Sequence, residues 1–562
     1  MDRIWLSSYP PTAPAEAPVQ AHRTLVELFE ASCRRYAERP AFTHLDVVLT
    51  YAELERQSRR FGAFLQGRLG LAKGERIAIM LPNLLQYPVA LFGALRAGLV
   101  VVNINPLYTA RELADQLADS GARAAVVLEN FAQTLEQALP SAPLPYVVTT
   151  QVGDLFPAPK RWAVNLAVKH LKRMVPRWRI AGSIGFRDAL NAGATLKLER
   201  PNPAPDDLAF LQYTGGTTGA PKGAMLTHAN MVANVEQTVA WIGDTLVPGR
   251  ETMLTALPLY HVFALTANLL LFVRLGGNDV LVSDPRDLRT LIGTMKKSRF
   301  TAITGVNTLF NALLNASGFD QVRRANGGAL KLSVAGGMAV QRAVAERWQQ
   351  AMGVPLVEGY GLTEASPNVC ANRFDTQTFS GKLGLPLPST EVAIMDERGA
   401  QVPLGEVGEI SVRGPQVMRG YWNRPEETAA VLTPDGWLKT GDMGWMDAQG
   451  YVGFTERRKD VIVVSGFKAY PTEIEDVAKL HPWIQDAGAV GVPDERSGEA
   501  VALFVVKADA GLSADAVRKH CAKYLTDYKL PRRVEFRDSL PKTPLGKVLR
   551  RQLRDEALGG HG

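Results

Sequence analysis

The chain has 562 residues, of which 46% are hydrophobic and 21% charged, a length that corresponds to about three or four domain-sized units. This composition is typical of a globular enzyme and excludes a disordered chain. The net charge is +7, and outside residues 160–179 the sequence offers no aromatic–basic platform, so we expect no nucleic-acid partner.

Cysteine usage and hydropathy point to a reducing compartment. The three cysteines are far apart and form no CxxC pair: Cys33, Cys370 and Cys521. This spacing argues against disulfides and against a cysteine metal site. Residues 1–18 lack the apolar core of a signal peptide. The most apolar long stretch, 257–273, is interrupted by His261 and Asn268, so it does not read as a membrane span. We expect a cytoplasmic protein, or one attached to a membrane from that side.

The first two thirds of the chain alternate between strand and helix patterns. Apolar runs at 76–81, 100–104 and 124–128 read as buried strands, with helices at 84–97 and 110–119 between them. The same pattern continues with strands at 252–257, 279–282, 302–305, 330–335 and 356–358 and helices at 288–297 and 340–350. Strands that alternate with helices predict parallel, doubly wound α/β sheets.

A basic stretch at 160–179 stands apart from this pattern. It contains seven Lys or Arg and no acidic residue: Lys160, Arg161, Lys169, Lys172, Arg173, Arg177 and Arg179. In a helix, Val164, Val168, Leu171 and Val175 share one face. A basic amphipathic helix with flanking tryptophans suits an anionic membrane surface, which would make the protein a peripheral one. An ordinary surface helix with solvated charges is the alternative, and the sequence leaves both open.

The segment 213–223, YTGGTTGAPKG, follows a buried apolar run at 208–211. Its glycines let the backbone approach a ligand closely, its threonines and backbone N–H groups are donors, and Lys222 adds a positive charge. This composition is typical of phosphate binding, although it is not the Walker pattern.

The hydropathy pattern changes after about residue 380. Short runs of alternating apolar and polar residues at 391–395, 409–412 and 451–454 predict a β-rich subdomain over about 380–456. A compact unit follows, with strands at 461–464, 488–492, 501–506 and 534–536 and helices at 472–479 and 514–526. Roughly 100 residues suffice for an independent core. We therefore expect a large N-terminal domain, 1–458, and a small α+β C-terminal domain, 459–562.

Four further motifs follow the glycine-rich segment in fixed order: YGLTE at 360–364, TGD at 440–442, ERRKDVIVVSGFKAYPTEIE at 456–475 and PKTPLGK at 541–547. Together the five motifs resemble those of the acyl-CoA synthetase, luciferase and peptide-synthetase adenylation superfamily. The stretch 435–460 is similar to the fatty acyl-CoA synthetase motif. Residues 4–10 and 257–271 resemble the bacterial long-chain fatty acid–CoA ligases, and the resemblance covers nearly the whole chain.

The resemblance implies a two-step reaction. The carboxylate of a fatty acid attacks the α-phosphorus of ATP, pyrophosphate leaves, and coenzyme A then displaces AMP from the acyl-adenylate. No protein nucleophile is required. Catalysis needs in-line positioning and neutralisation of phosphate charge, with Mg²⁺ as the metal ion.

Roles for individual residues follow from the resemblance. The ATP and AMP contacts are assigned to Tyr213, Thr214, Gly215, Gly216, Thr217, Thr218, Gly219, Lys222, Gly336, Gly337, Glu358, Gly359, Tyr360, Gly361, Thr363, Asp442 and Arg457. Within this set, 214–222 would hold the β- and γ-phosphates, Tyr360 would stack on adenine, and Asp442 would accept hydrogen bonds from the ribose hydroxyls. Glu364, with Thr218, would bind Mg²⁺.

The remaining roles concern the chemistry, the thiol and the acyl chain. Lys547 is expected to reach the α-phosphate and the carboxylate, with Thr363 near the α-phosphate and His261 near the carboxylate. Lys459 is the expected hinge of a mobile C-terminal domain. Coenzyme A would pass Ser465, Gly466 and Phe467, and the acyl pocket would include Phe263 and Val306. Discrimination of about 1 kcal/mol per methylene leaves the preferred chain length open, and a homodimer is also left open.

Two other functions were weighed. A related adenylating enzyme could pass its acyl group to another acceptor, but the loop at 465–471 fits coenzyme A. A non-catalytic fatty-acid binding protein with the same fold would be expected to have lost Lys547, Glu364 or Asp442, and all three are present.

Overall fold

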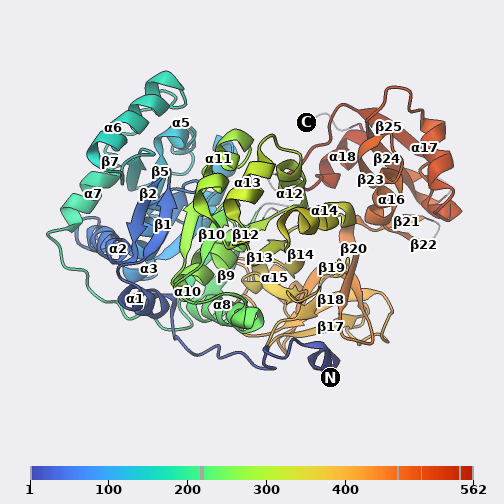
Figure 1. Cartoon of the computed structure of the whole chain (residues 1–562), viewed down its shortest axis with the longest axis horizontal. Helices are drawn as coiled ribbons and strands as arrows, with labels where there is room; N and C mark the ends of the chain where they lie inside the picture. The colour runs from blue at the N-terminus through green and yellow to red at the C-terminus, as the bar shows by residue number, and fades with distance from the viewer. Residues whose placement is uncertain are drawn as a thin grey trace.

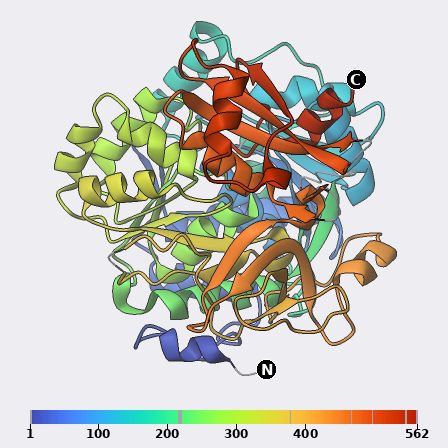
Figure 2. The same cartoon turned by 90° about the vertical axis from the view of Figure 1, so that its right-hand side faces the viewer.

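The computed structural model describes residues 3–214, 221–376, 378–464, 467–494, 497–543 and 546–559. A large body built on two sheets carries a β-rich layer and a C-terminal unit at one end of its long axis (Figure 1). Figure 2, which views the molecule from that end, shows the C-terminal unit lying over the edge of the β-rich layer.

The first sheet has seven strands in the order β7-β6-β5-β3-β4-β8-β9. All of its pairs are parallel except β8 with β9. Its strands are β3 (Arg76–Met80), β4 (Val100–Asn103), β5 (Ala124–Leu128), β6 (Tyr146–Thr150), β7 (Ile184–Gly185), β8 (Leu208–Thr214) and β9 (Lys222–Thr227). The helices between them are α3 (Gln86–Arg96), α4 (Ala110–Ser120), α5 (Ala132–Ala138), α6 (Ala158–Leu166) and α7 (Phe186–Gly193). Strand β5 is buried throughout, as expected for a parallel strand covered on both faces.

The second sheet has nine strands in the order β16-β15-β14-β13-β12-β10-β11-β1-β2. The strands from β14 to β1 run parallel, and the three outer pairs are antiparallel. The strands are β1 (Pro40–His44), β2 (Val47–Thr50), β10 (Thr252–Thr255), β11 (Asn278–Leu281), β12 (Ala302–Gly305), β13 (Leu332–Ala335), β14 (Leu356–Gly361), β15 (Asn368–Ala371) and β16 (Leu385–Pro386). Helices elsewhere in this body are α1 (Leu25–Arg35), α2 (Tyr51–Gly67), α8 (His228–Ile242), α9 (Val262–Ala264), α10 (Leu271–Leu275), α11 (Leu288–Ser298), α12 (Asn307–Leu314), α13 (Phe319–Asn326) and α14 (Arg342–Met352).

The β-rich layer is a four-stranded antiparallel sheet, β17-β18-β19-β20. It consists of β17 (Glu391–Met395), β18 (Gly408–Arg413), β19 (Leu438–Met446) and β20 (Val452–Arg457), with helix α15 (Pro425–Val431) at its side. A single 3₁₀ turn, η7 (Arg458–Asp460), joins β20 to the C-terminal unit. A β-rich subdomain was expected here from the short alternating runs.

The C-terminal unit has its own core and its own sheet, in the order β22-β21-β24-β23. Strand β25 also pairs with β24, in parallel. Its elements are β21 (Ile462–Val464), β22 (Phe467–Ala469), β23 (Ile484–Asp494), β24 (Gly498–Lys507), β25 (Arg533–Arg537), α16 (Pro471–Lys479), α17 (Ala514–Cys521) and α18 (Arg550–Ala557). The α+β fold is confirmed, although α17 ends at Cys521 and not at the predicted 526.

The helix predicted over 160–179 is wrong in its second half. Helix α6 continues only as a π-helical turn, η3 (Ala167–Leu171), and the chain is irregular beyond it. Arg173 has a φ of 51°, and Pro176 cannot donate the hydrogen bond that a helix would require. Val175 therefore does not share a helical face with Val164.

Among the residues that the structure describes, no helix is long and apolar enough to cross a membrane.

Candidate active site

Three neighbouring parallel strands, β12, β13 and β14, end at one edge of the nine-stranded sheet and bring their following residues together. A Cβ atom built on Gly336 would lie 3.1 Å from Cε1 of Phe263 and 3.2 Å from the carbonyl oxygen of Gly359. Gly337 has a φ of 78°, and its Cβ position lies 4.0 Å from Cγ1 of Val306. Gly336 therefore has no room for a side chain, and Gly337 has a backbone conformation that favours glycine.

Tyr360 and Asp442 join this edge to the β-rich layer. The Tyr360 hydroxyl donates a hydrogen bond of 2.7 Å to Oδ2 of Asp442, and Nε of Arg457 lies 3.4 Å from Oδ1. Arg457 faces Asp442 because the two residues are paired across β19 and β20. Burial and the Asp442 charge raise the pKa of Tyr360 far above its usual value, so the phenol stays a donor. This contact anchors the hydroxyl end of the Tyr360 side chain against Asp442.

Glu364 lies in the 3₁₀ turn η6 (Thr363–Ala365) and is held by Tyr421, which the sequence analysis did not identify. The Tyr421 hydroxyl donates to Oε1 of Glu364 at 2.7 Å, while Lys222 lies 5.2 Å from the centre of the Tyr421 ring and pairs with Glu427. Tyr421 reaches this place because residues 419–422 run beside β9, joined to it by an isolated bridge and three backbone hydrogen bonds. No sequence motif signals that pairing.

A cavity of about 280 Å³ lies beside Glu364 and Tyr421. Its walls also include Lys439, Thr440, Gly441 and Arg458 among others. The cavity leaves room for a sizeable polar ligand next to the glutamate and the TGD motif.

The glycine-rich segment begins and ends on the β8–β9 hairpin. Thr214 and Lys222 are paired across the two strands, and the Tyr213 hydroxyl donates to Asp119 at 2.6 Å, which anchors the end of β8. Five of its predicted phosphate ligands, among them the predicted metal ligand Thr218, lie outside the described residues: Gly215, Gly216, Thr217, Thr218 and Gly219.

His261 precedes the short helix α9 and caps it, because its Nδ1 accepts a hydrogen bond of 3.3 Å from the backbone N–H of Phe263. Burial lowers the pKa of His261 to about 4, so the ring is neutral at pH 7. With Nδ1 accepting, the proton resides on Nε2, and the ring can donate one hydrogen bond.

Glu358 lies in the middle of β14, and Gly361 is its last residue. Oε1 of Glu358 accepts a hydrogen bond of 3.0 Å from the backbone N–H of Val340, and burial raises the pKa of the carboxyl to about 7. A Cβ on Gly361 would collide with the carbonyl of Pro367. Both residues thus shape the strand end between Gly336 and Glu364.

The C-terminal unit brings Lys547 to the same place. Gly546, with a φ of 80°, packs so closely on Thr308 of helix α12 that an added Cβ would lie 2.9 Å from its Oγ1. Burial, and next the positive charge of Arg457, lower the pKa of Lys547 to about 8, while Asp442 opposes the shift. Lys459 has its pKa lowered by burial and by Arg457, with Lys222 also contributing. Arg457, Lys459 and Lys547 thus gather around Asp442.

Of the three residues expected to meet coenzyme A, the structure describes only Phe467. Phe467 is exposed on β22 and stacks on Tyr528, with the ring centres 5.1 Å apart. Ser465 and Gly466 lie outside the described residues. Lys459, the predicted hinge, sits in the turn η7 between the two units.

Glu364 can serve as a magnesium ligand only together with oxygens from a substrate. The part of the chain that the structure describes contains no group of three or more His, Cys, Asp or Glu side chains that could hold a metal ion. Tyr421 engages one oxygen of the Glu364 carboxylate, and the other faces no described hydrogen-bond donor. One carboxylate plus phosphate oxygens is a set that Mg²⁺ commonly takes, so the residues fit this ion.

Comparisons with known proteins agree with this geometry. Residues 29–422 match the family model of the AMP-binding enzymes, and residues 473–547 match the model of the AMP-binding enzyme C-terminal domain. A long-chain-fatty-acid–CoA ligase from Escherichia coli O6:H1 is 52% identical, over 100% of this chain and 99% of the relative. The ligase of the same name from Haemophilus influenzae is 48% identical over 99% of both chains. A crystal structure of ATP-bound MatB from Rhodopseudomonas palustris superposes with a TM-score of 0.79 at 26% identity, covering 94% of this chain and 98% of that one.

Proposed function

The chain belongs to the AMP-binding enzyme family, and on this premise we propose that it is an ATP-dependent long-chain fatty acid–CoA ligase. It first joins a fatty acid to AMP with release of pyrophosphate. It then transfers the acyl group to coenzyme A, giving acyl-CoA and AMP. The ligases named above share about half of their residues with this chain over its full length.

The observation that carries the proposal is the cluster of cations around Asp442. Arg457 lies 3.4 Å from Asp442, and burial and the charge of Arg457 lower the pKa values of Lys459 and Lys547, while Asp442 opposes both shifts. A site that gathers several cations suits a polyanion, and a nucleotide triphosphate supplies one. Asp442 is at the same time an acceptor suited to ribose hydroxyls.

In the first step the protein positions the fatty acid and ATP and neutralises the charge on the phosphates. The fatty acid carboxylate lies near the neutral His261, which can donate a hydrogen bond to it, and the acyl chain lies along Phe263 and Val306. Tyr360 and the Gly336–Gly337 pair form the flat walls of the adenine site. Lys547 meets the negative charge that develops on the α-phosphate as the acyl–phosphate bond forms, and Thr363 lies near the same phosphate. Lys222 and the 214–219 backbone hold the phosphates that leave.

Magnesium would be held by Glu364 and by phosphate oxygens, with Thr218 as the second protein ligand. When bound, the ion neutralises phosphate charge. Tyr421 keeps the Glu364 carboxylate turned in one direction, a support that ligating carboxylates commonly need.

In the second step the C-terminal unit turns about Lys459 and brings the Ser465–Phe467 loop to the site. Gly466 leaves room for the thin pantetheine arm of coenzyme A. Lys547 leaves the site in the same movement. The thiol then attacks the acyl carbon and AMP departs.

A direct assay tests the proposed function. Purified protein is supplied with ATP, Mg²⁺ and a panel of fatty acids of different chain lengths, and AMP formation is measured with and without coenzyme A. We expect AMP and acyl-CoA to form in equal amounts. Repeated turnover should require coenzyme A. Turnover that does not need coenzyme A, or no turnover with any chain length, would contradict the proposal.

The pH dependence of ATP use reports on Lys547. Because its pKa is about 8 and only its protonated form carries the required charge, kcat/KM for ATP is expected to fall as the pH rises above about 8. Bound phosphates favour the charged ammonium, so the corresponding limb of kcat is expected at higher pH. Lys547→Arg stays protonated throughout this range and should lose the alkaline limb even if it reacts slowly. If kcat/KM of that variant still falls above about pH 8, the alkaline fall is due to another titrating group.

We also propose that the protein contacts an anionic membrane through the segment 160–179. The predicted face is outward only in part: Val164 packs against the core and Val168 is half-buried, whereas Leu171 is 78% exposed. Three apolar side chains outside that face are exposed as well: Trp162 (67%), Leu166 (60%) and Met174 (52%). The carbonyl of Leu45 accepts a hydrogen bond from Lys160, and Leu45 itself is exposed nearby. Apolar side chains among solvated cations suit the boundary of an anionic bilayer.

Binding to vesicles tests this surface. Replacing Lys172 and Arg173 by Gln should weaken binding to phosphatidylserine-containing vesicles by roughly 1 kcal/mol per charge, and salt should weaken the wild type. Lys519→Gln with Lys523→Gln, on and just after helix α17, is the matched control of equal charge. Helix α17 lies at the opposite end of the molecule from α6 (Figure 1). If both double variants weaken cosedimentation equally, or if neither does, the segment 160–179 is an ordinary surface segment and the proposal is wrong.

A further inference from the structure

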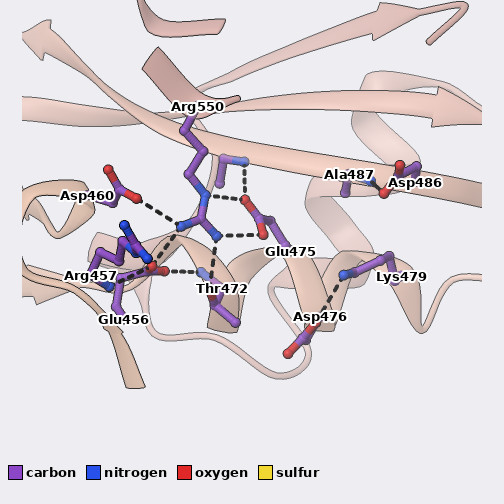
Figure 3. Close-up of polar contacts among 11 residues, drawn as sticks. Glu456, Arg457, Asp460, Thr472, Glu475, Asp476, Lys479, Asp486, Ala487 and Arg550 are labelled. Atoms are coloured by element: carbon purple, nitrogen blue, oxygen red, sulfur yellow. Dashed lines mark hydrogen bonds and ion pairs between the residues drawn. The ribbon is translucent and has the colours of Figure 1, made fainter. Parts of the chain in front are cut away.

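Arg550, the first residue of helix α18, is the centre of an ion-pair cluster where the C-terminal unit meets the β-rich layer (Figure 3). Its Nε and Nη2 donate to the two oxygens of Glu475 at 2.9 and 2.8 Å. Its Nη1 donates to Oε1 of Glu456 at 2.6 Å and lies 3.4 Å from Oδ2 of Asp460. Nη2 also donates to Oγ1 of Thr472 at 2.9 Å. One guanidinium thus contacts both sides of the turn η7.

Glu456 is the partner on the N-terminal side. It stands in β20, and its side chain is only 1% exposed. Besides Arg550, it accepts a hydrogen bond of 2.6 Å from the backbone N–H of Thr472, at the first turn of helix α16. A carboxylate in that place also interacts favourably with the helix N-terminus. Two hydrogen bonds that cross the turn η7 therefore end on a single carboxylate.

The cluster is asymmetric between the two sides. Glu475 belongs to α16, in the same unit as Arg550, and its bidentate contact would move with the arginine. The backbone N–H of Ala489 in β23 also donates to Glu475, at 2.8 Å. If the C-terminal unit turns about Lys459, Arg550 keeps a full counter-charge, whereas Glu456 loses both of its partners across the turn. The Glu456 contacts therefore belong to this one arrangement of the two units.

This arrangement is the one that holds Lys547 near Asp442. Lys547 stands three residues before Arg550, and Gly546 packs on Thr308 of the large domain. We propose that Glu456 and Arg550 are positioning residues: they latch the C-terminal unit in the adenylate-forming arrangement and so set the balance between the two half-reactions. This inference rests on the proposed function for the identity of those reactions.

The test is the ratio of the two half-reaction rates. Glu456→Gln keeps the size of the side chain and removes its charge, so the latched arrangement becomes less populated. The rate of thioester formation from supplied acyl-adenylate, divided by the rate of adenylate formation, should rise about tenfold, the size expected for one charge-assisted hydrogen bond. A purely structural role would lower both rates and leave their ratio unchanged, and that result would overturn the proposal. Arg554→Gln, on the same helix, breaks an ion pair with Glu499 inside the C-terminal unit and should leave the ratio at the wild-type value.

A distance measurement keeps the test independent of activity. Spin labels at Lys297→Cys on α11 and Lys519→Cys on α17 report the separation of the two units, since the three native cysteines are buried. Glu456→Gln should broaden or shift that distance distribution, and Glu456→Asp, which keeps the charge but shortens the side chain, should do so less. An unchanged distribution in a Gln variant with a normal melting curve would also overturn the latch. If the wild-type protein runs neither half-reaction, the proposed function fails, and the distances still decide on the latch.

Discussion

Lys547→Ala is expected to slow adenylate formation by about 10²–10³-fold, the loss seen when one donor to a developing oxyanion is removed. The ammonium meets negative charge that appears only as the acyl–phosphate bond forms, and such contacts lower the barrier more than contacts already present with bound ATP. Binding of ATP should weaken much less, because Lys222, Asp442 and the metal ion remain. Single-turnover rates of each half-reaction provide the measurement.

The second half-reaction distinguishes a catalytic lysine from a structural one. When synthetic acyl-adenylate is supplied, thioester formation by Lys547→Ala should be nearly normal, because the C-terminal unit has by then carried this residue away. Lys542→Ala is a matched control in the same loop, since Lys542 pairs with Asp486 within the C-terminal unit at 2.6 Å. Near-normal adenylation by Lys547→Ala would remove the residue from the mechanism. A parallel loss of both half-reactions with a lowered melting temperature would make it structural.

Lys459→Pro is expected to give the opposite pattern, with thioester formation slowed by about 10²-fold and adenylate formation affected far less. Proline fixes φ near −65°, and an incompatible backbone costs about 3 kcal/mol or more, which corresponds to that factor. The turn η7 already has a helical backbone in the arrangement seen here. The second arrangement, which needs a different φ and ψ at the hinge, is the one that suffers.

Lys459→Ala is the necessary control for this hinge experiment. The Lys459 side chain lies near Arg457 and Asp442, so its removal alone could weaken nucleotide binding. Alanine removes the side chain and leaves φ free, so a loss of thioester formation seen with proline and not with alanine belongs to the backbone. Equal slowing of both half-reactions by proline, with an intact fold, would contradict a hinge at this position.

Much of the fold could be read from the sequence because its signals are local. Buried strands such as β3 and β5 appear as short apolar runs, and helices such as α4 and α11 appear as a 3.6-residue period. The exception is 160–179, where an apparent period predicted a helix that stops at Leu171. The chain leaves helical geometry at Arg173, where φ is 51°, and Pro176 was the overlooked sign that no helix continues to 179.

The candidate site divides in a similar way. The residue types that chemistry requires, such as Lys547, Glu364 and Asp442, stand in motifs whose order and spacing the sequence displays. The residues that hold these side chains in place do not stand in such motifs. Tyr421 lies 57 positions from Glu364, and Arg550 lies 94 positions from Glu456. Such pairs meet only because residues 419–422 run beside β9 and because the C-terminal unit docks on β20.

The sequence by itself therefore determined the fold class, the family resemblance and the set of chemically active residues. Each of these depends on the identity of side chains and on the backbone's own repeat, which act over a few residues. Only the tertiary structure decided which apolar side chains of 160–179 face outward, that Tyr421 holds Glu364, and that Glu456 joins the two units through Arg550. Contacts between distant segments depend on how whole elements pack, and packing is a property of the assembled core that no local period encodes.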